Sequence, residues 1–230
     1  MKTKISASLA CANPINIQKD FEDLEKSCID LYHIDLCDGV FAPTFLLNSA
    51  VIKALRRLTQ RRLDVHIYGH HPSKYLDELK RSGTDVVIVH VETEGEDYIK
   101  TIQEIRRMGM KAGVAILPTS QIPENISQVL PLVSVVVANT VGPAYAGQTF
   151  NVAGVQNMKK IYDIAHDLGL ILEFAADGSV SSERLPLFLE AGANHFILGT
   201  SSLFLGNNLP ENARIFQENL SSEIEKMTKR

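Results

Sequence analysis

The chain contains 230 residues, of which 45% are hydrophobic and 22% charged, and its 27 acidic and 23 basic side chains give a formal net charge of -4 at pH 7. This composition excludes a disordered tail, a coiled coil and a collagen-like chain, because apolar residues are frequent and no heptad or Gly-X-Y period runs through the sequence. A nucleic-acid partner is not expected, since the net charge is negative and the notable basic cluster (Arg56, Arg57, Arg61, Arg62) is interpreted as the solvated end of a helix.

Short apolar runs rich in β-branched residues alternate with longer segments of helical spacing about eight times along the chain. The predicted strands are residues 5–10, 31–36, 63–67, 85–91, 111–117, 134–138, 171–176 and 195–198. The predicted helices include residues 17–27, 73–82, 96–108, 152–168, 181–190 and 210–226. Gly83 and Gly192 each lie between a predicted helix and the next strand, so both are interpreted as helix stops.

This strict alternation predicts a parallel sheet with right-handed crossovers. Eight units in a chain of this length match the α/β class with a (β/α)8 TIM barrel, which typically has ~250 residues. An open, doubly wound sheet is the alternative. No linker, low-complexity tract or shift in composition divides the chain, so residues 1–230 are expected to form one barrel domain.

Titratable residues lie near the carboxyl ends of several predicted strands. His33 and Asp35 share one face of their strand because side chains repeat every two residues, and Asp64 and His66 do the same in the next strand. Asp177 follows the strand at 171–176. Each histidine alone is equally well explained as a satisfied core residue. Two buried carboxylates need charge compensation, however, so together His33, Asp35, His66 and Asp177 predict a site for Zn, Mn, Fe or Co at the catalytic edge of a barrel.

Three glycine-containing turns follow strands at the same edge, at residues 142–148, 178–179 and 199–201. Loops in these places of a TIM barrel commonly bind phosphate through backbone N–H groups and a helix N-terminus. Each turn alone is ordinary turn chemistry. The coincidence of three favours a phosphate-bearing ligand.

Five segments carry a family resemblance: Ser6-Ala7-Ser8-Leu9, His33-Ile34-Asp35-Leu36-Cys37-Asp38-Gly39, Leu63-Asp64-Val65-His66, Gly142 to Phe150, and Asp177-Gly178-Ser179-Val180. Over about residues 5–205 the chain resembles the ribulose-phosphate 3-epimerase family, including its allulose-6-phosphate branch. The resemblance implies a ribulose-phosphate-binding barrel in which one divalent metal, Zn first and Fe, Mn or Co as alternatives, is held by His33, Asp35, His66 and Asp177. It also implies that Asp35 and Asp177 are the catalytic acid/base pair. The substrate-binding residues that it implies are Ser8, His66, Ala144, Tyr145, Ala146, Gly147, Gly178, Ser179, Gly199 and Thr200.

The implied reaction inverts C3 of a ketose phosphate, with D-ribulose 5-phosphate and D-xylulose 5-phosphate as the default pair. D-allulose 6-phosphate and D-fructose 6-phosphate are the alternative pair. Inversion next to a carbonyl needs one group to remove a proton from one face and another to return it to the other, so two carboxylates flanking a flat, metal-stabilised enediolate suffice. Asp64 is expected to orient a metal-bound imidazole. The alternative that is not an enzyme is a paralogue that binds a sugar phosphate without turning it over.

Some residues depart from the family pattern. Cys37, Tyr68 and Asn139 stand where the family usually has Met, and Ala175 stands where Glu is common. Tyr and Asn add hydrogen-bonding capacity to the roof of the pocket, which can change the choice of substrate. The altered roof favours the non-catalytic hypothesis, whereas retention of all four metal ligands favours an enzyme.

Other conspicuous residues have simpler interpretations. The His70-His71-Pro72 segment is expected to form a loop and helix start rather than a metal site. His90, at a strand end, is a candidate to line the site. Cys37 is interpreted as a packing residue, because no neighbour in the sequence offers a base that would make it a nucleophile.

The three cysteines, Cys11, Cys28 and Cys37, form no CxxC pair, which favours a reducing, cytoplasmic setting. No apolar run approaches the ~20 residues that cross a bilayer, and Asn13-Pro14 ends the first apolar stretch too early for a signal peptide. No membrane association is therefore expected. Self-association into a homo-oligomer is expected, with an apolar face in residues 51–58 or in the last helix.

Overall fold

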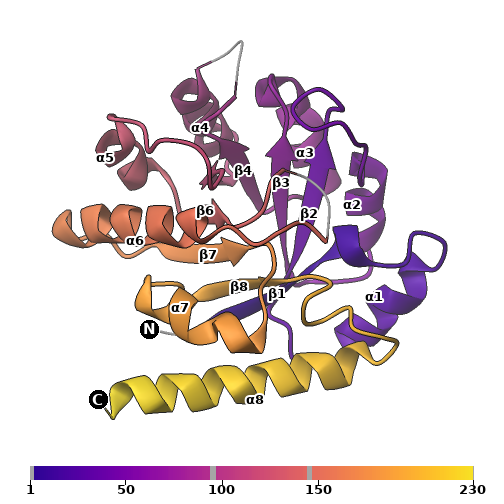
Figure 1. The fold of residues 1–230 in the computed structure, drawn as a ribbon. Helices are drawn as coiled ribbons and strands as arrows, with labels where there is room; N and C mark the ends of the chain where they lie inside the picture. The colour runs from indigo at the N-terminus through magenta and orange to yellow at the C-terminus, as the bar shows by residue number, and fades with distance from the viewer. Residues whose placement is uncertain (1–2, 94–96, 144–146, 230) are drawn as a thin grey trace.

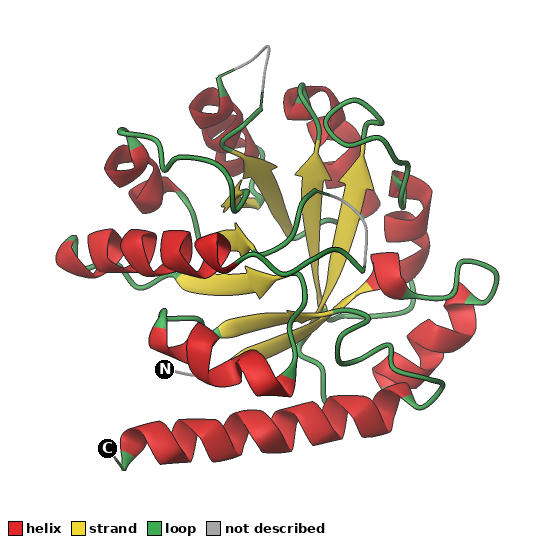
Figure 2. Cartoon of the chain, viewed as in Figure 1, coloured by secondary structure: helices red, strands yellow, loops and turns green. Residues whose placement is uncertain are grey.

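The computed structural model describes residues 3–93, 97–143 and 147–229. In this part of the chain eight strands pair in parallel and in chain order to form a closed barrel, and helices surround it (Figures 1 and 2). The strands are β1 Lys4–Ser8, β2 Leu31–Cys37, β3 Arg62–Tyr68, β4 Val86–His90, β5 Lys111–Ile116, β6 Val135–Asn139, β7 Glu173–Asp177 and β8 His195–Leu198. Pairing of β1 with β8 closes the barrel, so the predicted TIM barrel is confirmed and the open sheet is not.

Two of the helices in the described part of the chain lie outside the helix ranges named from the sequence. The helices are α1 Ile17–Glu25, α2 Ser49–Arg56, α3 Leu76–Ser82, α4 Tyr98–Arg107, α5 Ile126–Val129, α6 Val152–Asp167, α7 Leu185–Glu190 and α8 Leu209–Thr228. Helix α2 begins at Asn48, whose side chain accepts hydrogen bonds from the backbone N–H groups of Ala50 and Val51. Helix α5 spans four residues, which is too short for a helical period to be recognised.

Several predicted boundaries shift by one or two residues. Strand β1 ends at Ser8, because residues 9–11 turn into a short 3-10 helix, and β7 begins at Glu173 rather than at Ile171, which is 90% exposed. Gly83 and Gly192 have φ values of +87° and +94° at the ends of α3 and α7, so the predicted helix stops are confirmed. His71 precedes a 3-10 turn that starts at Pro72, which is the loop and helix start expected there.

The barrel interior is apolar on one side and polar on the other. Its buried apolar cluster comes mainly from β4, β5 and β6, with Ala175 and Ile197 completing it. The polar side chains come mainly from β1, β2, β3, β7 and β8, and His90 of β4 and Asn139 of β6 join them at the carboxyl ends of their strands. Alternate residues of the strands face outward and pack against the helices in a separate, larger core.

The interpretation of the four arginines as one solvated helix end is wrong. Arg57 is exposed, but the chain leaves α2 there and re-enters the sheet at β3. Arg56 pairs with Asp85 at 3.3 Å, and Arg61 donates hydrogen bonds to backbone carbonyl groups at the end of α1, including that of Glu25. The side chains of Arg62 and Asp64 both point into the barrel, because the two residues lie two positions apart on one strand.

None of the helices in the described part of the chain combines the length and the apolar character that crossing a membrane requires.

Candidate active site and metal centre

Four side chains meet at the carboxyl end of the barrel. His33 and Asp35 come from β2, His66 from β3 and Asp177 from the last position of β7. One ligand atom of each lies within 4.8 Å of the others. The strand register explains the meeting, because Asp35 lies directly opposite His66 in the parallel pair of β2 and β3. The predicted convergence of these four residues on one point is confirmed.

The four groups face one another at short distances. His33 Nε2 lies 3.2 Å from Asp35 Oδ1 and 3.3 Å from His66 Nδ1. His66 Nδ1 lies 3.5 Å from Asp35 Oδ1 and 3.7 Å from Asp177 Oδ2. Both histidine side chains are fully buried. Two imidazole nitrogens and two carboxylates around one buried point are a donor set that suits Zn and other first-row divalent ions, so the residues present fit a metal.

The two carboxyl groups differ in their electrostatics. Burial raises the pKa of Asp35, but the charge on His33 and the hydrogen bond with His33 outweigh burial and hold that pKa well below its ordinary value. Burial raises the pKa of Asp177 to about 6, against the attraction of His33 and with the help of the negative charge on Asp35. Neighbouring carboxyl groups whose pKa values are pushed apart suit a pair of catalytic base and acid.

The two imidazoles also differ. Burial lowers the pKa of His33, but the charge and hydrogen bond of Asp35 outweigh it and raise that pKa to about 9. Burial lowers the pKa of His66 to about 3, although the negative charge of Asp35 opposes the shift. Without a metal, a proton on His33 therefore balances part of the negative charge of the two carboxylates.

A pocket opens above this cluster. Asp35 and Asp177 line it, and it also contains six of the predicted substrate-binding residues: Ser8, Gly147, Gly178, Ser179, Gly199 and Thr200. His66 is fully buried and does not line the pocket, while residues 144–146, which carry the predictions for Ala144, Tyr145 and Ala146, lie outside the described residues. The pocket also includes Ser201 from the predicted turn at 199–201, and Cys11 and Val141, which sequence reasoning did not place in the site.

The turn after β7 has a backbone that few residues tolerate. Gly178 and Ser179 both have positive φ, at +96° and +50°. A Cβ at Gly178 would lie 2.5 Å from Cγ2 of Val141, so both the conformation and the space require glycine there. Thr140 donates a hydrogen bond from Oγ1 to the carbonyl of Asp177 at 3.2 Å. The hydrogen bond from Thr140 thus ties this turn to the end of β6, beside the pocket.

Two of the residues that depart from the family pattern, Tyr68 and Asn139, bind the Asp177 carboxylate. Asn139 donates from Nδ2 to Asp177 Oδ2 at 2.9 Å and to the hydroxyl of Tyr68 at 2.8 Å, and Tyr68 donates to the same Oδ2 at 3.3 Å. On the other side, Ser8 donates to Asp35 Oδ2 at 3.1 Å. Burial raises the pKa of the half-buried Cys37 thiol to about 12, which agrees with a packing role and not with a nucleophile.

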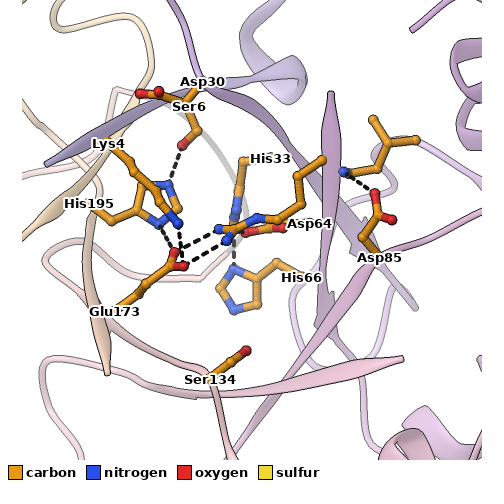
Figure 3. Close-up of polar contacts among 12 residues, drawn as sticks. Lys4, Ser6, Asp30, His33, Asp64, His66, Asp85, Ser134, Glu173 and His195 are labelled. Carbon is orange, nitrogen blue, oxygen red and sulfur yellow. Dashed lines mark hydrogen bonds and ion pairs between the residues drawn. The ribbon is translucent and has the colours of Figure 1, made fainter. Parts of the chain in front are cut away.

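Asp64 lies deeper in the barrel and is paired differently from the expectation. Its Oδ2 accepts a hydrogen bond from Arg62 at 2.7 Å, and no hydrogen bond joins it to an imidazole in the described part of the chain. Burial raises the pKa of Asp64 to about 6 although Arg62 opposes the shift. Figure 3 shows Lys4, Glu173 and His195 meeting beside His33 and Asp64.

His90 does not line the pocket but contacts a metal-cluster residue. Its Nε2 lies 2.9 Å from Nε2 of His66, and its Nδ1 lies 2.9 Å from Oε2 of Glu92. Sequence reasoning noted His90 at a strand end and missed Glu92. Glu92 lies in the turn two residues after His90, which is the last residue of β4, so strand alternation gave no signal for it.

Known proteins resemble this chain over most of its length. Residues 4–204 match the family model described as the Ribulose-phosphate 3 epimerase family. A Ribulose-phosphate 3-epimerase of Bacillus subtilis (strain 168) is 32% identical over 201 residues, which cover 86% of this chain and 91% of that protein. One of Chlamydia trachomatis is also 32% identical, over 87% of this chain and 83% of that protein.

Solved structures of related folds agree with the barrel. A ligand complex of KGPDC from Streptococcus mutans superposes with a TM-score of 0.72 at 14% identity, covering 96% of this chain and 98% of that chain. The 3-keto-L-gulonate-6-phosphate decarboxylase of Vibrio cholerae superposes with a TM-score of 0.69 at 15% identity, covering 96% of this chain and 99% of that chain. At these identities the likeness shows the fold alone.

Proposed function

The chain belongs to the ribulose-phosphate 3 epimerase family, and from this membership we propose that it is a metal-dependent epimerase that interconverts D-ribulose 5-phosphate and D-xylulose 5-phosphate by inverting C3. The observation that carries the proposal is the pair Asp35 and Asp177, which lie in one buried cluster and both face the same pocket. The Bacillus subtilis relative is named Ribulose-phosphate 3-epimerase.

The two aspartates move the proton. The carbonyl at C2 makes the hydrogen on C3 acidic, and a carboxylate beside that carbon can remove it. Asp35, whose pKa is low, is ionised and ready to act as a base, whereas Asp177, with a pKa of about 6, can deliver a proton to the other face. In the reverse direction the two roles exchange. Ser8 holds Asp35, and Tyr68 with Asn139 holds Asp177, so each carboxylate stays in place.

The metal would be held by His33, Asp35, His66 and Asp177, with zinc as the first candidate and iron, manganese or cobalt as alternatives. A bound divalent ion supplies Lewis-acid stabilisation of the negative charge that develops on the substrate oxygens. The burial of both imidazoles keeps water away from this side of the cluster.

We assign the phosphate end of the substrate to the small residues of the pocket, Gly147, Gly178, Ser179, Gly199 and Thr200. They line one cavity together with Asp35 and Asp177, which supports a single substrate that spans both groups. Glycines let an anion approach backbone N–H groups closely.

The test is proton NMR in D2O with Zn2+-reconstituted protein, offering D-ribulose 5-phosphate and D-allulose 6-phosphate in separate samples. We expect loss of the C3 proton signal and appearance of the epimer with the pentose phosphate. Turnover of the hexose phosphate alone would move the assignment to the allulose branch. Protein that binds Zn2+ and both sugars without exchange at C3 would contradict an epimerase and favour a binding protein.

We also propose a cytoplasmic homo-oligomer. The three cysteines are all free, which is consistent with a reducing compartment. Apolar side chains remain exposed at Leu58, next to α2, and at Ile215 of α8, 63% and 44% respectively. Sedimentation equilibrium with Leu58→Glu and Ile215→Glu variants tests whether either face carries the association.

A further inference from the structure

A continuous chain of hydrogen bonds leads from the metal cluster to the backbone of the barrel. His66 turns Nδ1 toward Asp35 and Asp177 and places Nε2 2.9 Å from His90 Nε2. His90 Nδ1 lies 2.9 Å from Glu92 Oε2, and the other oxygen of Glu92 accepts the backbone N–H of Leu117 at 2.8 Å. The side chains of His66 and His90 are fully buried, and their ring planes lie 13° apart.

The direction of the hydrogen bonds follows from the carboxylate at the end of the chain. An ionised carboxylate only accepts, so Glu92 requires a proton on Nδ1 of His90. Neutral His90 then has a bare Nε2, which must accept a proton from Nε2 of His66. Neutral His66 consequently has no proton on Nδ1, the atom that faces the cluster.

We propose that His90 and Glu92 are positioning residues that fix the tautomer of His66, so that its Nδ1 lone pair is presented to the metal. This inference rests on the proposed metal-dependent function. It assigns a role to two residues outside the four-residue cluster, because a carboxylate behind a metal-binding imidazole both orients the ring and makes it a better ligand.

The packing around His90 leaves its ring one orientation. The Phe41 ring centroid lies 4.9 Å from that of His90, and the Tyr68 ring centroid lies 4.8 Å away. These aromatic rings flank the imidazole, so hydrogen bonds in its plane are left to its two nitrogens, and both are used. Because the His90 ring cannot turn, the proton position that Glu92 requires on His90 also determines the proton position on His66.

Replacing Glu92 by glutamine gives a sharp test, because the amide has one acceptor where the carboxylate has two. If its oxygen accepts the N–H of Leu117, its NH2 group faces His90 Nδ1 and requires a bare nitrogen there. The proton of His90 then moves to Nε2, and His66 is driven to carry its proton on Nδ1, where it opposes the metal. Glu124→Gln, which removes a carboxylate at an exposed position, is the matched control.

Two readouts are needed, neither of which depends on turnover. The first is the affinity for Co2+, measured by its visible absorption in competition with a chelator. The second is the ring 15N spectrum of the metal-free protein, in which protonated and bare imidazole nitrogens differ. We expect Glu92→Gln to weaken Co2+ binding by roughly 10- to 100-fold and to move the His66 proton to Nδ1, while Glu124→Gln behaves like the unaltered protein.

The 15N spectrum of the unaltered protein tests the inference even if the Glu92→Gln variant does not fold. A bare His66 Nδ1 supports the inference, and a protonated one overturns it. Unchanged Co2+ affinity in a folded Glu92→Gln variant overturns the inference alone. Unaltered protein that binds no Co2+ overturns the proposed function, and the inference with it.

Discussion

Replacement of Arg62 by leucine tests the polar half of the barrel interior. Arg62 donates to Asp64 at 2.7 Å and to the two oxygens of Glu173 at 2.8 Å each, and its side chain is 19% exposed. Asp64 is fully buried and receives no other hydrogen bond in the described part of the chain. In the Arg62→Leu variant Glu173 retains its ion pair with Lys4, whose Nζ lies 2.5 Å from Glu173 Oε1. Arg62→Leu therefore leaves one carboxylate, Asp64, buried without a partner.

Breaking a buried ion pair by removing one partner costs about 3–5 kcal/mol of unfolding free energy. For a protein of this size, each kcal/mol lowers the melting temperature by roughly 2–4 °C, so Arg62→Leu is expected to melt about 6–20 °C lower. Arg57→Leu makes the same chemical change at an exposed position and should stay within about 0.5 kcal/mol. Calorimetry or circular dichroism of the metal-free proteins measures both shifts.

A second change identifies the cause. Because the cost comes from an uncompensated charge, Arg62→Leu with Asp64→Asn should recover a measurable part of the lost stability. Equal melting temperatures for Arg62→Leu and Arg57→Leu would refute the reasoning, and so would a double variant that is no more stable than Arg62→Leu.

Three further predictions concern the site and its surroundings. Tyr68→Phe removes a hydroxyl that donates to the charged Asp177 carboxylate, so we expect kcat to fall about tenfold with little change in KM, from a bond worth about 1.5 kcal/mol; steady-state kinetics would contradict this if kcat were unchanged. Burial raises the pKa of Glu173, but hydrogen bonds from Arg62 and Lys4 outweigh it and lower that pKa to about 2. Glu173 thus stabilises the fold above its ordinary pKa of 4.5 and loses this effect as the pH falls toward 2, so the urea midpoint of Glu173→Gln should fall less over that interval than that of the unaltered protein. Removal of the metal by a chelator should abolish turnover, and adding Zn2+ should restore it. An activity assay after dialysis tests this, and activity that persists in the metal-free protein would disprove it.

The barrel and the metal cluster were predictable because their signals are local. Eight apolar runs alternate with helical segments, which predicts a parallel sheet, and eight units in a chain of this length favour the closed barrel that the structure has. His33 with Asp35, and Asp64 with His66, lie two residues apart on a strand, so each pair must share a face. The face that points inward is the one that carries the ligands.

The partners of those residues could not be predicted, because they come from distant parts of the chain. Asn139 and Tyr68 are 71 residues apart, and both meet Asp177 on a third strand. Arg62 was misinterpreted because a charged residue beside other arginines is typical of a solvated surface. Only the register of β3 shows that it turns into the barrel toward Glu173, 111 residues away.

The most direct test of the two-aspartate account is an Asp177→Asn variant loaded with Zn2+ and followed by proton NMR in D2O. If two carboxylates act on opposite faces, the variant should lose epimer formation by about 10²- to 10⁴-fold, while Asp35 still exchanges the C3 proton of one epimer for deuterium. Epimer formation at a rate near that of the unaltered protein, in a variant shown to hold the metal, would contradict the account.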